Sequence, residues 1–290
     1  MSSRSGSAAG AALELFELEM LGGSTERRYR RMRPDVDALP WGTLDPKSFA
    51  PEDVASARAH WTVNAFQEQR TGAACAETVR TLLACRAPLD LVALATRFPL
   101  DEIVHVEMCA RIAEELGGGW PLEYDARRLA PAPDRDDPPL LQAAEMIVAA
   151  FCVGEAFSVP VIRGTWHATR HPLVKAVIGI ILRDEASHGM FGWAFLDWAG
   201  DALAPHRPRL AEIARLAIAE FTANHREIAR RRDAGDRDPG RDLGWMSPTP
   251  YLALGRRPMI KSVIEPLRRR GIDPYAGAPD PFRARATSVD

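Results

Sequence analysis

The sequence predicts an all-α fold, a four-helix bundle with an additional fifth helix and with extensions at both ends. Three observations favour this class. Long stretches of helical character are separated by proline and glycine, no stretch is a convincing strand, and 290 residues at 46% hydrophobic are enough to bury one large core. We expect an N-terminal tail and surface segment at 1–47, the helical bundle at 48–232 and a C-terminal extension with a short helix at 233–290.

Proline and glycine mark the ends of the first two expected helices. The first begins at Pro51, a residue type favoured at the first helical position, and runs to about Cys85. The second spans residues 88–116 and ends at the three consecutive glycines 117–119. Pro99 lies inside the second helix, and because proline removes a backbone hydrogen bond we expect a kink or a fresh helical start there.

Three more helices complete the expected bundle. A connection at 121–139, rich in proline and aspartate, is long enough to cross a bundle from end to end. A third helix then spans 138–169 with a bend at Pro160, a fourth spans 172–198, and a fifth spans 208–232.

The sequence predicts only a general structure for the segments outside these helices. Residues 11–47, with clustered arginines and spaced prolines, predict a segment that wraps over the surface. Residues 233–250 predict a loop, and residues 258–270 predict a short basic helix. The Ser-, Gly- and Ala-rich residues 1–10 lack the apolar run of a secretory signal, so we expect a cytoplasmic location.

Charge and hydropathy weigh against two classes of partner. A formal net charge of -2 gives no broad attraction for nucleic acid or for an anionic membrane. The stretch 140–162 is apolar enough to resemble a membrane span, but Glu145, Glu155 and Pro160 interrupt it. Because charged groups at membrane depth are costly, we expect a buried helix there. From the low net charge we expect a ligand that is small or neutral.

The pattern Asp-Glu-x-x-His occurs twice, at 101–105 and at 184–188, and these are the only Glu-x-x-His matches in the chain. A Glu and a His three residues apart project from one face of a helix, one turn apart, so both can ligate the same metal ion. Two such helices can hold two ions side by side.

Two bridged metals need one further Glu from each of two other helices. In the first expected helix the candidates are Glu68 and Glu77. Glu68 shares its helix face with apolar and small residues, whereas Glu77 shares its face with Arg70 and Arg80. We therefore expect Glu68 to point inward and Glu77 to point to solvent.

In the third expected helix the candidates are Glu145 and Glu155, and both have apolar neighbours. Spacing provisionally favours Glu155, which precedes Glu185 by 30 residues, close to the 34 residues that separate Glu68 from Glu102. Choosing Glu145 would break this symmetry and move the carboxylate by about 15 Å along the helix axis.

The resulting set has four carboxylates and two imidazoles: Glu68, Glu102, His105, Glu155, Glu185 and His188. Oxygen ligands mixed with imidazole nitrogen suit iron or manganese, and four negative charges neutralise two divalent cations. Zinc is disfavoured because it prefers fewer and softer ligands. Without metal, four carboxylates together in an apolar core are too costly to explain as packing.

With this set of residues the chain resembles the ferritin-like superfamily, and within it the dimetal-carboxylate oxidases and oxygenases. The resemblance covers about residues 51–232 and implies a ferritin-like four-helix bundle. It implies that the upstream glutamates, Glu68 and Glu155, ligate metal and that the motif glutamates, Glu102 and Glu185, bridge or ligate. These four carboxylates would be the catalytic set. Each motif histidine, His105 and His188, would take one metal.

The Asp that opens each motif also belongs to the family pattern. A ligating His donates its second ring N–H to an oxygen acceptor that fixes its tautomer and orientation. We expect Asp101 and Asp184 to be these acceptors, each crossing to the His of the opposite motif.

Four positions depart from patterns found in the superfamily. An Arg often stands before the motif His, where this chain has Val104 and Ser187. Cys109 stands where radical-forming ribonucleotide reductase subunits carry a tyrosine, which favours a likeness to bacterial multicomponent hydroxylases. Ile181 stands where some arylamine N-oxygenases carry a third His, so that subfamily is not supported.

These features predict a soluble non-haem diiron oxygenase or oxidase that activates O2 to oxidise a small organic substrate. The implied cofactor is two iron ions, with Mn/Fe or two Mn as alternatives. The implied partners are O2, the substrate and an electron donor such as a reductase or ferredoxin, with no nucleic acid and no membrane. A homodimer is one assembly compatible with this prediction.

Three other functions stay open. One is ferritin-like iron handling, in which the same six ligands oxidise Fe(II) for storage. Storage subunits are shorter bundles, however, and have no place for the C-terminal extension of this chain. A manganese-catalase-type protein is the next alternative. The last is a helical interaction protein whose metal site has decayed, although all six ligand types are present.

Overall fold

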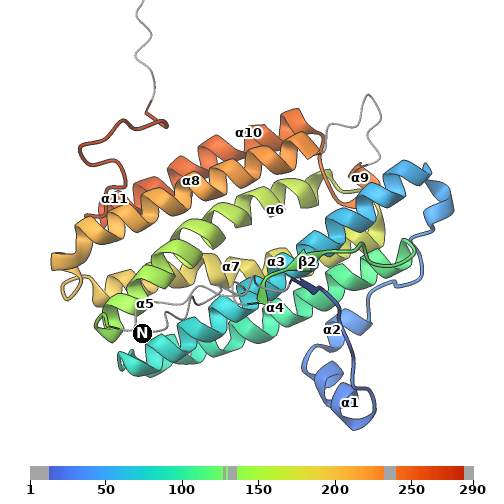
Figure 1. Cartoon of the computed structure of the whole chain (residues 1–290), viewed down its shortest axis with the longest axis horizontal. Coiled ribbons are helices and arrows are strands. Elements are labelled where there is room, and N and C mark those ends of the chain that lie inside the picture. Colours follow the sequence, from blue (N-terminus) through green and yellow to red (C-terminus); the bar gives the residue numbers. More distant parts are fainter. Residues whose placement is uncertain (1–12, 127–128, 130–135, 232–239, 284–290) are drawn as a thin grey trace, which may run out of the picture.

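The computed structural model of the chain describes residues 13–126, 129, 136–231 and 240–283. These described residues are about 75% helical, with only a small two-stranded sheet among them, which confirms the all-α prediction. The long helices lie side by side along the longest axis of the molecule (Figure 1).

The first two long helices, α3 (Pro51–Ala84) and α4 (Leu89–Glu115), lie where the sequence predicts them and pack chiefly against each other. Gly117, at φ 107°, ends α4 in the left-handed conformation that favours glycine. Of the two alternatives predicted at Pro99, a kink or a fresh helical start, the fresh start is wrong, because α4 continues through this residue.

The third long helix has three parts, α5 (Pro139–Ile147), the π-helical η3 (Val148–Glu155) and α6 (Ala156–Ala168). The helix predicted at 138–169 is present, and it continues through Pro160, but the π-helical segment was not predicted. A π-turn accommodates one extra residue, so side chains after it rotate by about 100° relative to a regular α-helix.

Two further helices follow as predicted. α7 (Pro172–Ala199) packs against α6 and η3, and α8 (Arg207–Arg231) packs against the other side of η3. A short 3-10 turn, η4 (Ala204–His206), joins α7 to α8. The chain thus contains two helical hairpins, α3 with α4 and the α5–η3–α6 helix with α7. Contacts of α4 with α7 and of α3 with α5 connect them.

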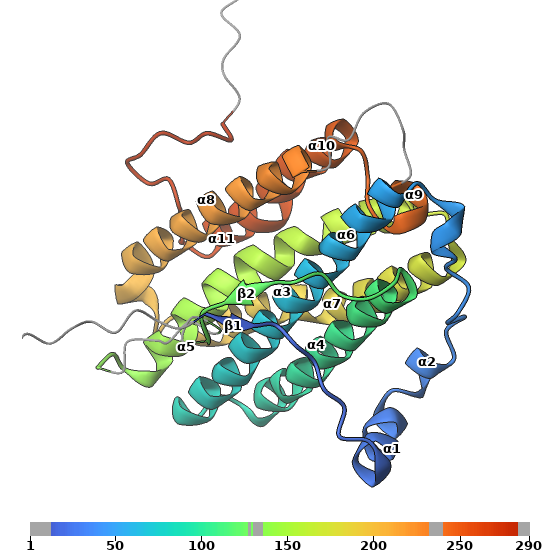
Figure 2. The same ribbon diagram turned by 45° about the vertical axis from the view of Figure 1, so that its right-hand side comes forward.

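The N-terminal surface segment has local structure that the sequence does not announce. It contains α1 (Gly23–Met32), α2 (Pro34–Asp37) and a 3-10 turn, η1 (Pro46–Ser48). In Figure 2 α1 and α2 lie beside α4, on the side of the molecule away from α8 and α10. The tail expected at 1–10 lies outside the described residues.

A short strand pair corrects the expectation that the chain has no strand. β1 (Glu14–Leu15) pairs antiparallel with β2 (Glu123–Tyr124), so the N-terminal segment meets the connection between the two hairpins beside α3 (Figure 2). Next to the strands, the Phe66 ring of α3 lies 5.3 Å from Phe16 and 5.1 Å from Tyr124.

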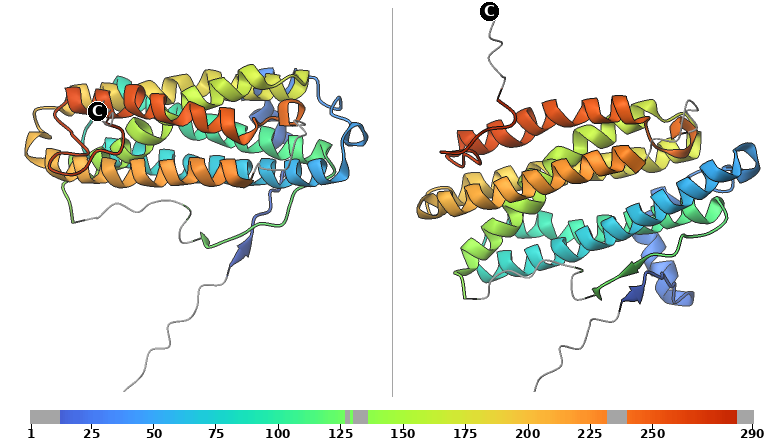
Figure 3. Two further views of the ribbon diagram at one scale, coloured as in Figure 1. Left: turned by 90° about the horizontal axis from the view of Figure 1, so that it is seen from above. Right: turned by 45° about the horizontal axis from the view of Figure 1, so that its top comes forward.

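The C-terminal helix is longer than predicted. It runs from α10 (Pro248–Pro258) through the π-helical η5 (Met259–Ile264) to α11 (Glu265–Arg269), preceded by the short α9 (Gly240–Leu243). The helix predicted at 258–270 is therefore only its second half, and part of the loop predicted at 233–250 is helical. Figure 3 shows α10 lying along α6 and α8, and α10 contacts both of them.

Buried apolar side chains form two clusters along the axis of the helices. One contains Leu82, Phe98, Phe151, Phe191 and Phe195. The other contains Trp61, Met108, Ile112, Leu173 and Val177. The residues between them on α3, α4 and α7 are those of the two motifs and Glu68, so a polar belt separates two halves of the core.

One helix among the described residues, Pro139–Ala168, is long and apolar enough to cross a membrane. In its most apolar 18-residue window, 61% of the residues are buried inside the protein, as in the core helix of a soluble protein. The buried helix expected from the sequence is therefore supported.

Glycine permits the close approach of α7 to the π-helical segment. A Cβ placed on Gly192 of α7 would lie 2.7 Å from Sγ of Cys152 and 3.1 Å from its backbone nitrogen. A backbone atom cannot move aside as a flexible side chain can. Gly192 therefore lets η3, which ends at Glu155, pack directly on α7.

Replacing Gly192 with alanine should destabilise the protein by about 1–3 kcal/mol in urea unfolding, because the added methyl group overpacks this contact. Gly189→Ala, one turn earlier on α7, is the control, since its Cβ would lie 3.3 Å from the Val159 side chain and no closer than 3.6 Å to a backbone atom. Equal stability of the two variants would contradict the tight packing of η3 on α7.

Candidate metal centre

The six predicted ligand residues come together from four helical segments. α3 supplies Glu68, α4 supplies Glu102 and His105, the last residue of η3 is Glu155, and α7 supplies Glu185 and His188. They form two overlapping groups that could each hold a metal ion, and within each group one ligand atom per residue lies within 4.8 Å of the others. Both groups contain Glu102 and Glu185.

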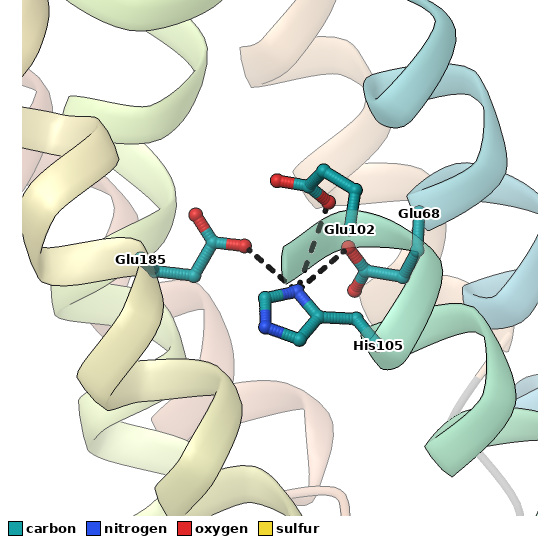
Figure 4. A group of neighbouring side chains, drawn as sticks. All are labelled: Glu68, Glu102, His105 and Glu185. Carbon is teal, nitrogen blue, oxygen red and sulfur yellow. Dashed lines mark ion pairs between the residues drawn. The ribbon is translucent and has the colours of Figure 1, made fainter. Parts of the chain in front are cut away.

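The first group surrounds His105, as Figure 4 shows. Nδ1 of His105 lies 3.7 Å from Oε2 of Glu68, 3.7 Å from Oε2 of Glu102 and 3.5 Å from Oε1 of Glu185. One imidazole nitrogen thus faces carboxylates from three different helices.

The second group surrounds His188. Its Nδ1 lies 3.0 Å from Oε1 of Glu102 and 3.1 Å from Oε2 of Glu185, and Glu155 completes the group. The two oxygens of Glu102 therefore face different histidines, and so do the two oxygens of Glu185. This is the arrangement that a bridging carboxylate requires.

Several of these buried atoms have no hydrogen-bond partner within the described part of the chain. They are both carboxylate oxygens of Glu102, Oε2 of Glu185, Nδ1 of His105, and both ring nitrogens of His188. A buried polar atom without a partner costs free energy, and such atoms are rare in folded proteins. Six of them in one place, all on carboxylates and imidazoles, fit a cation-binding site.

The electrostatics of the group agree with a site built for cations. Burial, together with the neighbouring carboxylates, raises the pKa of Glu68 to about 8 and raises that of Glu155 well above its ordinary value. Burial alone would lower the pKa of His188, but the carboxylates of Asp101, Glu102 and Glu185 beside its ring outweigh this effect and raise the pKa to about 12. Without metal, protons are therefore retained on the group.

The aspartates that open the two motifs lie on the outer side of the histidines and cross between helices. Nε2 of His105 on α4 lies 3.4 Å from Oδ2 of Asp184 on α7. Nε2 of His188 on α7 lies 3.6 Å from Oδ2 of Asp101 on α4. Each ring therefore presents Nδ1 to the glutamates and Nε2 to an aspartate of the opposite motif.

Sequence reasoning missed Arg33, which connects the two aspartates. Its guanidinium donates to Oδ1 of Asp101 at 2.9 Å and to Oδ2 of Asp184 at 2.7 Å. It lies between α1 and α2, in a segment expected only to wrap the surface, and no motif marks it. Only the burial of its side chain distinguishes Arg33 from the neighbouring arginines, and burial cannot be read from the sequence.

The rejected glutamates have other partners. Glu145 pairs with Arg209 and thereby links α5 to α8. Glu77 pairs with Arg80 on the same helix, and 26% of its side chain is exposed. The alternatives to Glu68 and Glu155 are thus satisfied away from the cluster.

Removing the Glu68 carboxylate should stabilise the metal-free protein in a pH-dependent way. The pKa of Glu68 rises from 4.5 to about 8 on folding, so the folded chain holds a proton that the unfolded chain releases. Wild-type stability should therefore fall as the pH rises from 4.5 to 8, and the advantage of Glu68→Gln should grow over the same range.

Urea unfolding in the presence of a chelator measures this difference. Glu77→Gln on the same helix is the control, because it loses only an exposed ion pair worth about 0–1 kcal/mol. A Glu68→Gln variant that is less stable than wild type at pH 8 would show that this carboxylate serves packing instead of a ligand.

Comparison with known protein families, with curated proteins and with solved structures finds no match to this chain. Its chemistry must therefore be inferred from its own residues. Those residues form a buried cluster of glutamates and histidines, on a helical framework, that could hold a metal ion.

Proposed function

We propose that the chain is a ferritin-like diiron protein that uses O2 to oxidise a small organic substrate. The observation that supports this proposal is the overlap of the two ligand groups, which have Glu102 and Glu185 in common. Two cations held by common carboxylates lie close enough to act on one bound molecule. In this proposal α3, α4, the α5–η3–α6 helix and α7 are the four helices of the bundle.

The donor set favours iron, with manganese as the alternative. Each group offers three carboxylates and one imidazole, and the six residues together carry up to four negative charges. That charge balances two divalent cations, and the mixture of carboxylate oxygen with imidazole nitrogen suits Fe(II) or Mn(II) better than zinc. Bound iron would supply the electrons that reduce O2.

The protein surroundings make the two ends of the centre unequal. The Phe98 ring lies 4.2 Å from the His188 ring and also packs against Phe151 and Phe191, which gives that end an apolar wall. At the other end, 20% of the Glu68 side chain is exposed, whereas the Glu102 side chain is fully buried. We infer that O2 and the substrate approach from the Glu68 end.

The chain's residues would have separate tasks in an oxygenase reaction. One atom of O2 enters a C–H or N–H bond of the substrate and the other leaves as water, which requires two electrons from a reductase or ferredoxin and two protons from solvent. The aromatic wall excludes water from one end, and Asp101 and Asp184 keep the histidine rings in place. Cys109, buried beyond His105, offers no phenol for a stable tyrosyl radical.

Single substitutions should separate the two metal positions. Glu68→Ala and Glu155→Ala each remove a ligand from one group, so each variant should retain about one metal per chain. Glu102→Ala removes a ligand from both groups and should abolish binding of both metals. Elemental analysis after gel filtration measures the ratio, with Glu145→Ala as the control. Equal loss of metal in the three ligand variants would contradict two overlapping positions.

Oxygen reactivity tests the proposed activity. The wild-type protein, loaded with Fe(II) without air and mixed with O2, should consume O2 at two irons per chain and show a transient visible absorption. Fe(III) mineral accumulating far beyond two irons per chain would instead indicate iron storage, and disproportionation of H2O2 by the Mn-loaded protein would indicate a catalase. Failure to bind Fe(II) or Mn(II) at all would falsify the proposal.

A further inference from the structure

Arg33 lies between the two motif helices, directly outside the histidines. Its Nη1 donates to Asp101 on α4 and its Nη2 donates to Asp184 on α7. The same two carboxylates face the Nε2 atoms of His188 and His105. One guanidinium therefore contacts the outer partners of both histidines.

Three arginines surround the aspartate pair, and Arg33 differs from the other two in burial. Its side chain is 10% exposed, whereas those of Arg97 and Arg183 are 60% and 54% exposed. Water screens an exposed ion pair, so its loss costs little, whereas a buried carboxylate that loses its partner is left uncompensated. The aspartates thus depend mainly on Arg33.

The segment that carries Arg33 is attached to both motif helices. Arg30 donates to Glu107 on α4 at 2.6 Å, and Asp35 accepts from Arg183 on α7 at 2.9 Å. Nε of Arg33 also donates to Asp35, at 3.2 Å. The guanidinium is therefore held in one orientation by groups on three sides, unlike a mobile counter-ion.

We propose that Arg33 is a positioning residue of the metal centre, supplied by the N-terminal segment. It fixes Asp101 and Asp184, which in turn fix the rings of His188 and His105 with Nδ1 toward the glutamates. This inference rests on the proposed metal-binding function. Because loss of such an outer partner weakens metal binding by roughly 10- to 100-fold, and because Arg33 contacts both aspartates, both metal positions should weaken together.

A titration with Mn(II), followed by the electron paramagnetic resonance signal of the free ion, tests the proposal. Arg33→Gln should bind both Mn(II) ions roughly 10- to 100-fold more weakly than wild type. Arg33→Lys keeps the charge but has a single nitrogen where the guanidinium uses three, so it should fold like wild type and still bind both ions more weakly. Asp184→Asn should weaken mainly the position that contains His105.

Two controls separate positioning from charge. Arg97→Gln removes an exposed charge from the same aspartates, and Arg31→Gln removes an exposed charge from α1, so both should bind Mn(II) within about threefold of wild type. Circular dichroism and urea unfolding establish that each variant is folded. If Arg33→Gln does not fold, Arg33→Lys and Asp184→Asn provide the same comparison.

The outcomes distinguish this inference from the proposed function. Wild-type affinity in Arg33→Lys would show that Arg33 contributes charge alone, and a loss confined to one metal position would show that it does not connect the two halves; either result overturns the inference. A wild-type protein that binds no Mn(II) and no Fe(II) would overturn the proposed function itself.

Discussion

The free-energy cost of placing four carboxylates and two imidazoles inside an apolar core is the constraint on which the rest of the structure depends. Burying these groups without compensation is unfavourable, and the raised pKa values of Glu68 and Glu155 express that cost. The two apolar clusters on either side of the polar belt offset it through burial of large side chains such as Trp61 and Phe151. The fold can keep such a belt because the long helices are anchored above and below it.

Much of the helical framework was predictable, because proline and glycine act locally. Pro51 and Pro172 begin helices where such residues fit best, and Gly117 ends one in a conformation that glycine tolerates. The π-helical η3, which packs against both α7 and α8, was not predictable, because no proline or glycine pattern in the sequence marks it. The helix face could not choose between Glu145 and Glu155, because both have apolar neighbours in the sequence.

The candidate site was predictable where its residues repeat along a helix and not where they meet only in space. The spacing of Glu102 and His105, and its repetition at Glu185 and His188, identified two helices at once, and the helix face selected Glu68. Arg33 gave no such signal, since it lies 68 residues from Asp101 and 151 residues from Asp184. The absence of an arginine at position 104 or 187 indicated that the histidine surroundings were altered, but it could not show which segment supplies a guanidinium instead.

The distance along the chain between Arg33 and Asp184 has a consequence for how the protein folds. Contacts between residues far apart in sequence form slowly, because the intervening chain loses entropy before the contact is gained. The two helical hairpins contain mostly local contacts and can form first, and the N-terminal segment can dock only after α4 and α7 are adjacent. The segment that precedes both hairpins in the sequence is thus among the last to reach its place, and the aspartate pair stays without its buried partner until then.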